Sequence, residues 1–266
     1  MTIRYEVKDH IALITIDRYE KRNSFDVEHS EQLMACWDDV RDNPDVWVAI
    51  ITGVKNVFCS GGDLNVMRQT ARETAELGHS PTRDRMTRNN TQYFTLKGFD
   101  IYKPIVAAVN GFCMAGGMEL LGGADIRIAS TEAQFSVTEV RRGLFAGGGT
   151  TARLPRQLNW PAAMELLLVG ENISAERALQ LGLVNEVVPH GEILTAAYRW
   201  ASKIASNAPI AVQQTKKSAL LGFRAGSLLE AFKIEDECHD PVFASEDARE
   251  GATAFLEKRK PVWKGR

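Results

Sequence analysis

Apolar positions in the first part of the chain follow two spacings, one typical of strands and one typical of helices. Residues 3–8 and 11–16 alternate or run apolar around a short polar break, which predicts an antiparallel hairpin. Asp26 opens a stretch whose apolar residues recur every three or four positions as far as Asn43, which predicts a helix. Residues 46–52 are almost continuously apolar and predict a strand buried on both faces.

Strand and helix signals then alternate through the middle of the chain. Residues 104–109 and 125–129 predict strands, and residues 116–121 between them predict the start of a helix. This alternation implies a mostly parallel sheet with right-handed crossovers. Helical patterns dominate from residue 174 onward, so the sequence predicts an α/β protein with a helical C-terminal region.

One segment differs in composition from its surroundings. Residues 64–96 are rich in Arg, Thr, Glu and Asn, and Gly78 and Pro81 interrupt them near the middle. We expect a mobile helix–loop–helix insert outside the core that acts as a lid over a ligand. The alternative is a plain solvated connection.

Composition and charge exclude several classes of protein. The 266 residues are 44% hydrophobic and 25% charged, as in an ordinary globular protein. A formal net charge of −2 argues against a broad cationic surface for nucleic acid. No apolar run reaches the roughly 18 residues that a membrane helix requires, so we expect a cytoplasmic protein. The four cysteines are dispersed, without a cysteine–histidine spacing that fits a metal site.

Two glycine-containing turns each follow a predicted strand and precede a predicted helix. Residues 58–64 contain Gly61 and Gly62, and residues 110–119 contain Gly116. Backbone amides at a helix start carry partial positive charge and can bind an oxygen that becomes negative during a reaction. Two such turns could polarise a thioester carbonyl from two sides. A single turn of this kind is equally well explained as a simple connection.

Two glutamates could complete such a site. Glu119 lies three residues inside the second helix start among apolar neighbours, and burial of a carboxylate without a purpose is costly. Glu139 follows twenty positions later, shortly before the glycine run 147–149. The two carboxylates could flank one substrate. Alternatively, Glu139 is a surface residue paired with Arg141 or Arg142.

Together these features resemble the enoyl-CoA hydratase/isomerase family, also known as the crotonase superfamily, over nearly the whole chain. The similar segments are residues 20–24, 58–64, 110–119, 135–139, 175–188, 243–251 and 254–261. The resemblance implies an α/β fold, a crotonase-like spiral of ββα units with a helical C-terminal trimerisation region. Residues 1–195 would form the spiral core with the catalytic site. Residues 196–266 would complete the CoA site and the trimer contacts.

The resemblance also implies roles for individual residues. Gly62 and Gly116 match the two oxyanion-hole amides of the family, and Glu119 and Glu139 match the two catalytic acids of its hydratases. The residues that the resemblance places against the substrate or CoA are Lys21, Arg22, Ser60, Gly61, Asp63, Leu64, Phe255 and Lys258. A neighbouring subunit would supply the last two.

Because both glutamates are present, the resemblance implies reversible addition of water to a trans-2-enoyl-CoA, giving a 3-hydroxyacyl-CoA. The alternative in the same fold is a Δ3,Δ2-enoyl-CoA isomerase or another crotonase-type acyl-CoA lyase. A non-catalytic or RNA-binding homologue is disfavoured by the balanced charge and the glutamate pair. The expected substrate is an acyl-CoA thioester and the expected assembly a homotrimer or a dimer of trimers. No metal, redox cofactor, nucleic acid or membrane is expected as a partner.

Overall fold

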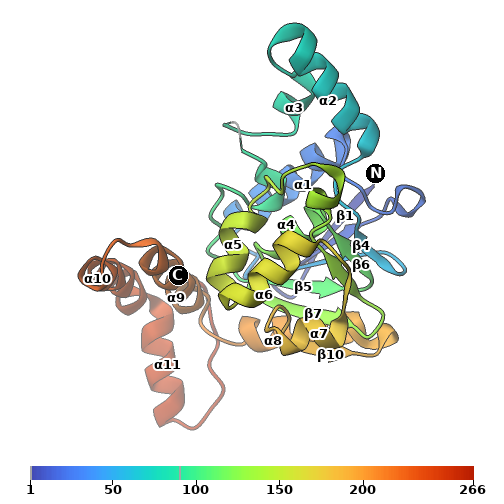
Figure 1. Ribbon diagram of the computed structural model, residues 1–266. Coiled ribbons are helices and arrows are strands. Elements are labelled where there is room, and N and C mark those ends of the chain that lie inside the picture. The colour runs from blue at the N-terminus through green and yellow to red at the C-terminus, as the bar shows by residue number, and fades with distance from the viewer. Residues whose placement is uncertain (1, 90) are drawn as a thin grey trace.

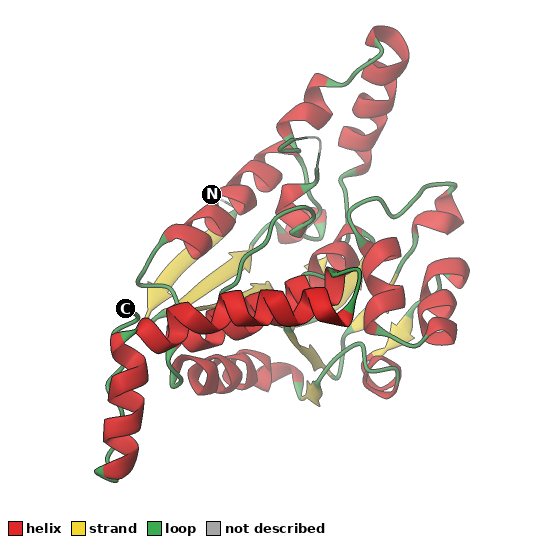
Figure 2. Cartoon of the chain, turned by 90° about the vertical axis from the view of Figure 1, so that its left-hand side faces the viewer, coloured by secondary structure: helices red, strands yellow, loops and turns green. Residues whose placement is uncertain are grey.

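The structure, a computed structural model, describes residues 2–89 and 91–266, and these fold into two β-sheets with helices around them (Figures 1 and 2). In the larger sheet the strands lie in the spatial order β1 (Ile3–Lys8), β2 (Ile11–Ile16), β3 (Val48–Gly53), β5 (Ile105–Val109), β7 (Ile126–Ser130) and β10 (Glu186–Val188). The strands of the smaller sheet are β4 (Val57–Cys59), β6 (Phe112–Met114), β8 (Gln134–Ser136) and β9 (Ile173–Ser174). The pairs β1–β2 and β8–β9 are antiparallel, and all other neighbouring pairs are parallel.

The helices vary widely in length. They are α1 (Val27–Asp42), α2 (Leu64–Leu77), α3 (Pro81–Arg85), α4 (Gly116–Leu121), α5 (Thr150–Gln157), α6 (Trp160–Met164), α7 (Ala175–Gln180), α8 (Ile193–Ala205), α9 (Pro209–Arg224), α10 (Leu228–Ala244) and α11 (Glu246–Leu256). Short 3-10 or π turns are η1 (Tyr19–Lys21), η2 (Tyr93–Thr95), η3 (Glu139–Arg142), η4 (Glu165–Val169) and η5 (His190–Glu192).

Both faces of the larger sheet are covered, as the apolar run at residues 46–52 predicts. Ala49 and Ile51 of β3 face the main core, which also contains the buried side of α1 and residues of the smaller sheet. Val48 and Ile50 face the other way, toward Ala197 and its neighbours on α8. The predicted hairpin of β1 and β2, the predicted α1 and the predicted α/β fold with a mostly parallel sheet are confirmed.

Several elements have no counterpart in the sequence patterns. The strands of the smaller sheet are only two or three residues long, too short for an alternating pattern to be recognised. Helix α5 contains Pro155, which ordinarily disfavours a helix interior. These elements form because the main core accepts their apolar residues, such as Phe135 and Leu154.

The predicted insert divides into two parts. Helices α2 and α3 project from one end of the molecule, and none of the side chains of α2, all of which are described, is buried (Figures 1 and 2). The end of the insert does not fit the prediction of a segment outside the core, because Tyr93, Phe94 and Leu96 are buried. The backbone oxygen of Phe94 accepts a hydrogen bond of 3.1 Å from the indole of Trp37. The residues 93–96 are therefore core, and the projecting part is α2 with α3.

The C-terminal helices are arranged as a hairpin of α9 and α10 followed by α11, which extends away from the sheets (Figures 1 and 2). Their surface carries large apolar side chains that are exposed, namely Phe223, Leu228, Leu229, Phe232, Phe243, Phe255 and Leu256. The predicted boundary at residue 195 falls within α8, which packs on the larger sheet, and a division of the chain there stays a prediction. In the described part of the chain, no helix is both long enough and apolar enough to cross a membrane.

Candidate active site

A pocket of about 910 Å³ opens between the glycine turns, the insert and the loop that follows η3. The predicted site residues that line it are Lys21, Arg22, Ser60, Gly62, Asp63, Leu64, Gly116, Glu119 and Glu139. Gly61, Phe255 and Lys258 lie outside the set of described residues that line this pocket. The structure therefore brings together residues from four separate segments of the chain.

The first glycine turn joins β4 to α2. Gly61 has a φ of +101°, and a Cβ at this position would lie 2.7 Å from the Cβ of Ala115. Only glycine permits that backbone angle and that close approach between the two turns. The amides beside Gly62 are used within the protein, since Gly61 N donates to Cys59 Sγ and Asp63 N donates to the Phe25 oxygen. Gly62, between these two residues, lines the pocket.

The second glycine turn joins β6 to α4. Ala115 has a φ of +49°, a value that is strained for a residue with a side chain and that sets the direction of the chain entering the helix. Gly116 is the first residue of α4, so its N–H has no acceptor within the helix. Gly116 also lines the pocket. Gly62 and Gly116 thus line the same pocket, and the binding of one ligand oxygen by both amides stays a prediction.

Glu119 is buried deep in the pocket, with 7% of its surface exposed. Its Oε1 accepts a short hydrogen bond from Gly148 N, and its backbone oxygen accepts from Arg153 Nη1 at 2.8 Å. Burial, with a smaller contribution from the neighbouring Glu139 carboxylate, raises the pKa of this carboxyl to about 7 against the lowering effect of the Gly148 amide. A carboxyl in this state can take up or release a proton near neutral pH.

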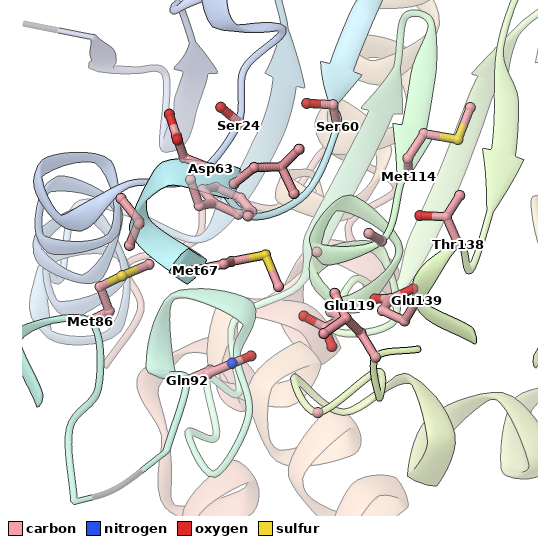
Figure 3. Close-up of a pocket in the computed structure, with 18 of the residues that line it drawn as sticks. Ser24, Ser60, Asp63, Met67, Met86, Gln92, Met114, Glu119, Thr138 and Glu139 are labelled. Atoms are coloured by element: carbon pink, nitrogen blue, oxygen red, sulfur yellow. The ribbon is translucent and has the colours of Figure 1, made fainter. Parts of the chain in front are cut away.

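Glu139 begins η3 and lies beside Glu119 on the pocket wall, where Figure 3 shows the two side chains next to each other. Only 8% of its surface is exposed, and burial raises its pKa. The alternative of a surface residue paired with Arg141 or Arg142 is wrong, because Glu139 is buried and forms no ion pair with any residue in the described ranges. Its Oε2 has no hydrogen-bond partner among these residues.

Among the residues expected at the CoA end, Asp63 differs from the others because its carboxylate has contacts within the protein. Lys21, Arg22 and Ser60 line the pocket, and Ser60 N donates a hydrogen bond of 3.1 Å to the backbone oxygen of Arg22. The carboxylate of Asp63 accepts from Asn65 N at the start of α2 and lies 3.4 Å from Arg18 Nη1, so it stabilises the turn. These contacts fix the start of α2 and occupy the Asp63 carboxylate within the protein, and the role of Lys21 and Arg22 at the CoA end stays a prediction.

Sequence reasoning missed two residues that support the site. Arg153 donates to the backbone oxygens of Thr95, Leu96 and Glu119, which ties the end of the insert to α4. Gln92 lines the pocket next to Glu119 (Figure 3). Neither residue lies in a motif, and their roles depend on which loops meet in the folded chain.

Phe255 and Lys258 lie at the end of α11, and Phe255 is 83% exposed. Their predicted contact with CoA requires a second copy of the chain, and it stays a prediction. Within residues 2–89 and 91–266, no three His, Cys, Asp or Glu side chains converge in a way that could hold a metal ion.

The α/β fold, with two turn amides beside two buried glutamates, is of the crotonase class. A family model described as enoyl-CoA hydratase/isomerase matches residues 6–266, and the chain belongs to that family. One relative, (E)-benzylidenesuccinyl-CoA hydratase from Thauera aromatica, is 38% identical over the full length of both chains. Enoyl-CoA hydratase EchA19 from Mycobacterium tuberculosis is 37% identical over 98% of this chain and 96% of its own. The crystal structure of enoyl-CoA hydratase EchA1 from Mycobacterium marinum superimposes with a TM-score of 0.89 at 38% identity, covering 100% of this chain and 99% of the other.

Proposed function

We propose that this protein is an enoyl-CoA hydratase that adds water reversibly to a trans-2-enoyl-CoA, giving a 3-hydroxyacyl-CoA. The observation that carries the proposal is the pair of buried carboxylates, Glu119 and Glu139, in one pocket with the amides of Gly62 and Gly116. The hydratase names of the full-length relatives support the same reaction.

In the proposed mechanism the thioester oxygen accepts hydrogen bonds from Gly62 N and Gly116 N. This polarises the conjugated double bond and stabilises the enolate that forms when oxygen adds at C3. Glu119 takes a proton from water as the new C3–O bond forms, and Glu139 delivers a proton to C2. The enolate electrons return to form the C2–H bond, and the reverse sequence eliminates water.

The environments of the two glutamates suit these roles. Glu119, with a pKa raised to about 7, is the ionised base in an increasing fraction of molecules as the pH rises through neutrality. Burial raises the pKa of Glu139, which favours the protonated form that an acid must have. The rate of hydration should therefore rise with pH through about 7 as Glu119 ionises.

The acyl group would lie against the insert. Met67 of α2 and Met86 after α3 line the pocket together with Met114 (Figure 3). Methionine is flexible and adapts to ligands of different shape. We propose that these side chains contact the acyl chain, with Lys21 and Arg22 near the phosphates of CoA, Ser60 and Leu64 beside the ligand, and Gly61 and Asp63 shaping the turn around it.

A panel of enoyl-CoA thioesters, assayed for loss of the absorbance of the conjugated thioester, tests the proposal. We expect 3-hydroxyacyl-CoA as the product. Conversion of a 3-enoyl-CoA without uptake of water would instead identify the Δ3,Δ2-isomerase, in which a single glutamate moves the proton between two carbons. Absence of both reactions over the whole panel would refute the assignment.

We also propose a cytoplasmic homotrimer, or a dimer of trimers, that acts on the thioester without a metal or redox cofactor, because amides and carboxylates supply the charge stabilisation and the proton transfers. The exposed apolar side chains of α9 to α11 support an assembly that covers them. In it, Phe255 and Lys258 would reach the adenine end of CoA bound to a neighbouring copy. Light scattering would give the assembly, and Lys258→Ala should raise KM for the CoA ester while kcat stays constant.

A further inference from the structure

Gln92 occupies a fixed position at the junction of the insert and the core. It directly precedes η2, and its backbone oxygen accepts hydrogen bonds from Thr95 N at 3.0 Å and Thr95 Oγ1 at 2.7 Å. The same Thr95 hydroxyl lies 2.9 Å from the backbone oxygen of Gly148. The backbone of Gln92 is therefore anchored to the turn whose amide holds Glu119.

The side chain of Gln92 extends from this anchor toward Glu119 (Figure 3). Its Oε1 is buried and has no hydrogen-bond partner among the residues that the structure describes. A Cβ on Gly148 would lie 2.5 Å from Gln92 Oε1 and would also overlap the carboxylate of Glu119. The amide of Gln92 and the carboxylate of Glu119 therefore converge on one small volume beside Gly148.

A buried amide oxygen beside a carboxylate is unfavourable unless a hydrogen lies between them. A carboxamide can supply that hydrogen, because a half-turn of its terminal group exchanges its acceptor oxygen for an NH₂ donor. A water molecule between the two groups can supply it as well. Leucine, which has a similar volume, offers neither solution.

We propose that Gln92 is a positioning residue of the proposed hydratase reaction. Its carboxamide orients the Glu119 carboxylate and the reacting water for proton transfer between them. The NH₂ group donates to ionised Glu119, and the amide oxygen accepts from the water that Glu119 deprotonates. Glu139, whose Oε2 also lacks a hydrogen-bond partner among the described residues, lines the same pocket. This inference rests on the proposed function and adds a neutral third group to the pair of glutamates.

The test is Gln92→Leu, compared with Gln180→Leu as a matched control on the exposed side of α7, away from the pocket. Loss of a hydrogen bond to a charged group should lower kcat by about 10- to 100-fold, with KM and the melting temperature nearly unchanged. Because ionised Glu119 loses a donor, the acid limb of the pH–rate profile should move to higher pH. A purely structural role would change the melting temperature and leave that limb in place. A wild-type rate with an unmoved limb would overturn the proposal.

A second variant covers the case in which Gln92→Leu fails to fold. Gln92→Glu keeps the shape and places a like charge beside Glu119, so it should move the acid limb to higher pH, and an unmoved limb contradicts the proposal.

One measurement does not depend on activity. Isotope-edited infrared titration of the free enzyme follows the Glu119 carboxyl, identified by its loss in Glu119→Gln. In Gln92→Leu its pKa should rise, and an unchanged pKa overturns the positioning role. If the wild-type protein hydrates none of the thioesters, the proposed function fails alone, because this titration still decides the role of Gln92.

Discussion

The projecting insert and the pocket wall shift the pKa of a glutamate carboxyl in opposite directions. Glu73 lies on the projecting insert, where hydrogen bonds from Ser80, Thr82 and Gln69 lower its pKa to about 2. Glu119 lies in the wall of the pocket, where burial raises its pKa to about 7. Hydrogen bonds within the insert keep the Glu73 carboxylate charged at all physiological pH values. Burial in the pocket wall instead brings the pKa of Glu119 close to neutral pH, where the carboxyl can transfer a proton.

The two regions also differ in what fixes them. Helix α4 is held by a hydrogen bond from the half-buried Arg153 and by the main core, and the Gly148 turn is held by a hydrogen bond from the Thr95 hydroxyl. Helix α2, by contrast, has no buried side chain over its described length and is tied to α3 mainly through Glu73. The proposed proton transfers, which need a fixed geometry, therefore lie in the firmly held pocket wall, and the proposed acyl contacts lie on the less firmly held insert.

The largest loss of kcat should follow from replacing a glutamate of the pocket wall by glutamine, and the same replacement on the insert serves as the comparison. Glu119→Gln and Glu139→Gln should each lower kcat by about 10² to 10⁴-fold, with binding of a CoA product analogue retained, because each removes a group that transfers a proton. Glu73→Gln should leave kcat within about twofold, a change too small to reflect loss of a proton-transfer group. Steady-state kinetics measure all three, and near-normal turnover in either pocket variant would contradict the hydratase mechanism.

A smaller loss of kcat should follow from a larger side chain at Gly148, beside Glu119. Gly148→Ala places a Cβ against the Glu119 carboxylate and Gln92, so we expect kcat to fall by about 100-fold through misplacement of Glu119. Gly147→Ala is the comparison in the same turn, since the nearest atom to its Cβ would be 3.8 Å away. The two rates should differ by at least about tenfold, and equal rates would show that the geometry around Glu119 is not limiting.

Stability should reveal the raised pKa of Glu119 without any substrate. Because the folded state binds the proton more tightly than the unfolded chain, the stabilisation is complete below pH 4.5 and is lost as the pH rises to about 7. Relative to Glu119→Gln, the wild-type protein should lose about 3 kcal/mol over this window, at 1.36 kcal/mol for each unit. Urea unfolding at several pH values measures the difference. A constant difference from pH 4 to pH 8 would refute the shift.

The smallest effect concerns the motion of the insert. Amides of α2 and α3 should exchange rapidly in the free protein and become protected when an acyl-CoA product analogue binds, whereas β3 stays protected in both states. The buried residues 93–96 should behave like β3 and not like α2, which sharpens the boundary between the two regions. Equal exchange of α2 with and without saturating ligand would identify the insert as a passive connection.

Strands β1, β2, β3, β5 and β7 of the larger sheet, helix α1, the two glycine turns and the family could be predicted from the sequence, whereas strand β10 lies in a region predicted to be mainly helical. Those features are largely local, because a long apolar run specifies a buried strand and a glycine such as Gly61 allows the positive φ that a tight turn requires. Glu119 could be predicted as buried because its neighbours along the helix are apolar. Its match to the family's catalytic position then indicated its role.

The burial of Glu139, the core position of residues 93–96 and the contact between Gln92 and Glu119 depend on the tertiary structure. Local sequence allowed Glu139 to be an exposed partner of Arg141 or Arg142, and its burial depends on the pocket formed by distant segments. Residues 93–96 belong by composition to a polar insert. They are part of the core because Phe94 contacts both Trp37 and Phe25, which lie far away in the sequence. Gln92 and Glu119 meet beside Gly148 although they come from separate segments. Such contacts between distant segments depend on long-range packing, and no periodic pattern of apolar residues in the sequence indicates them.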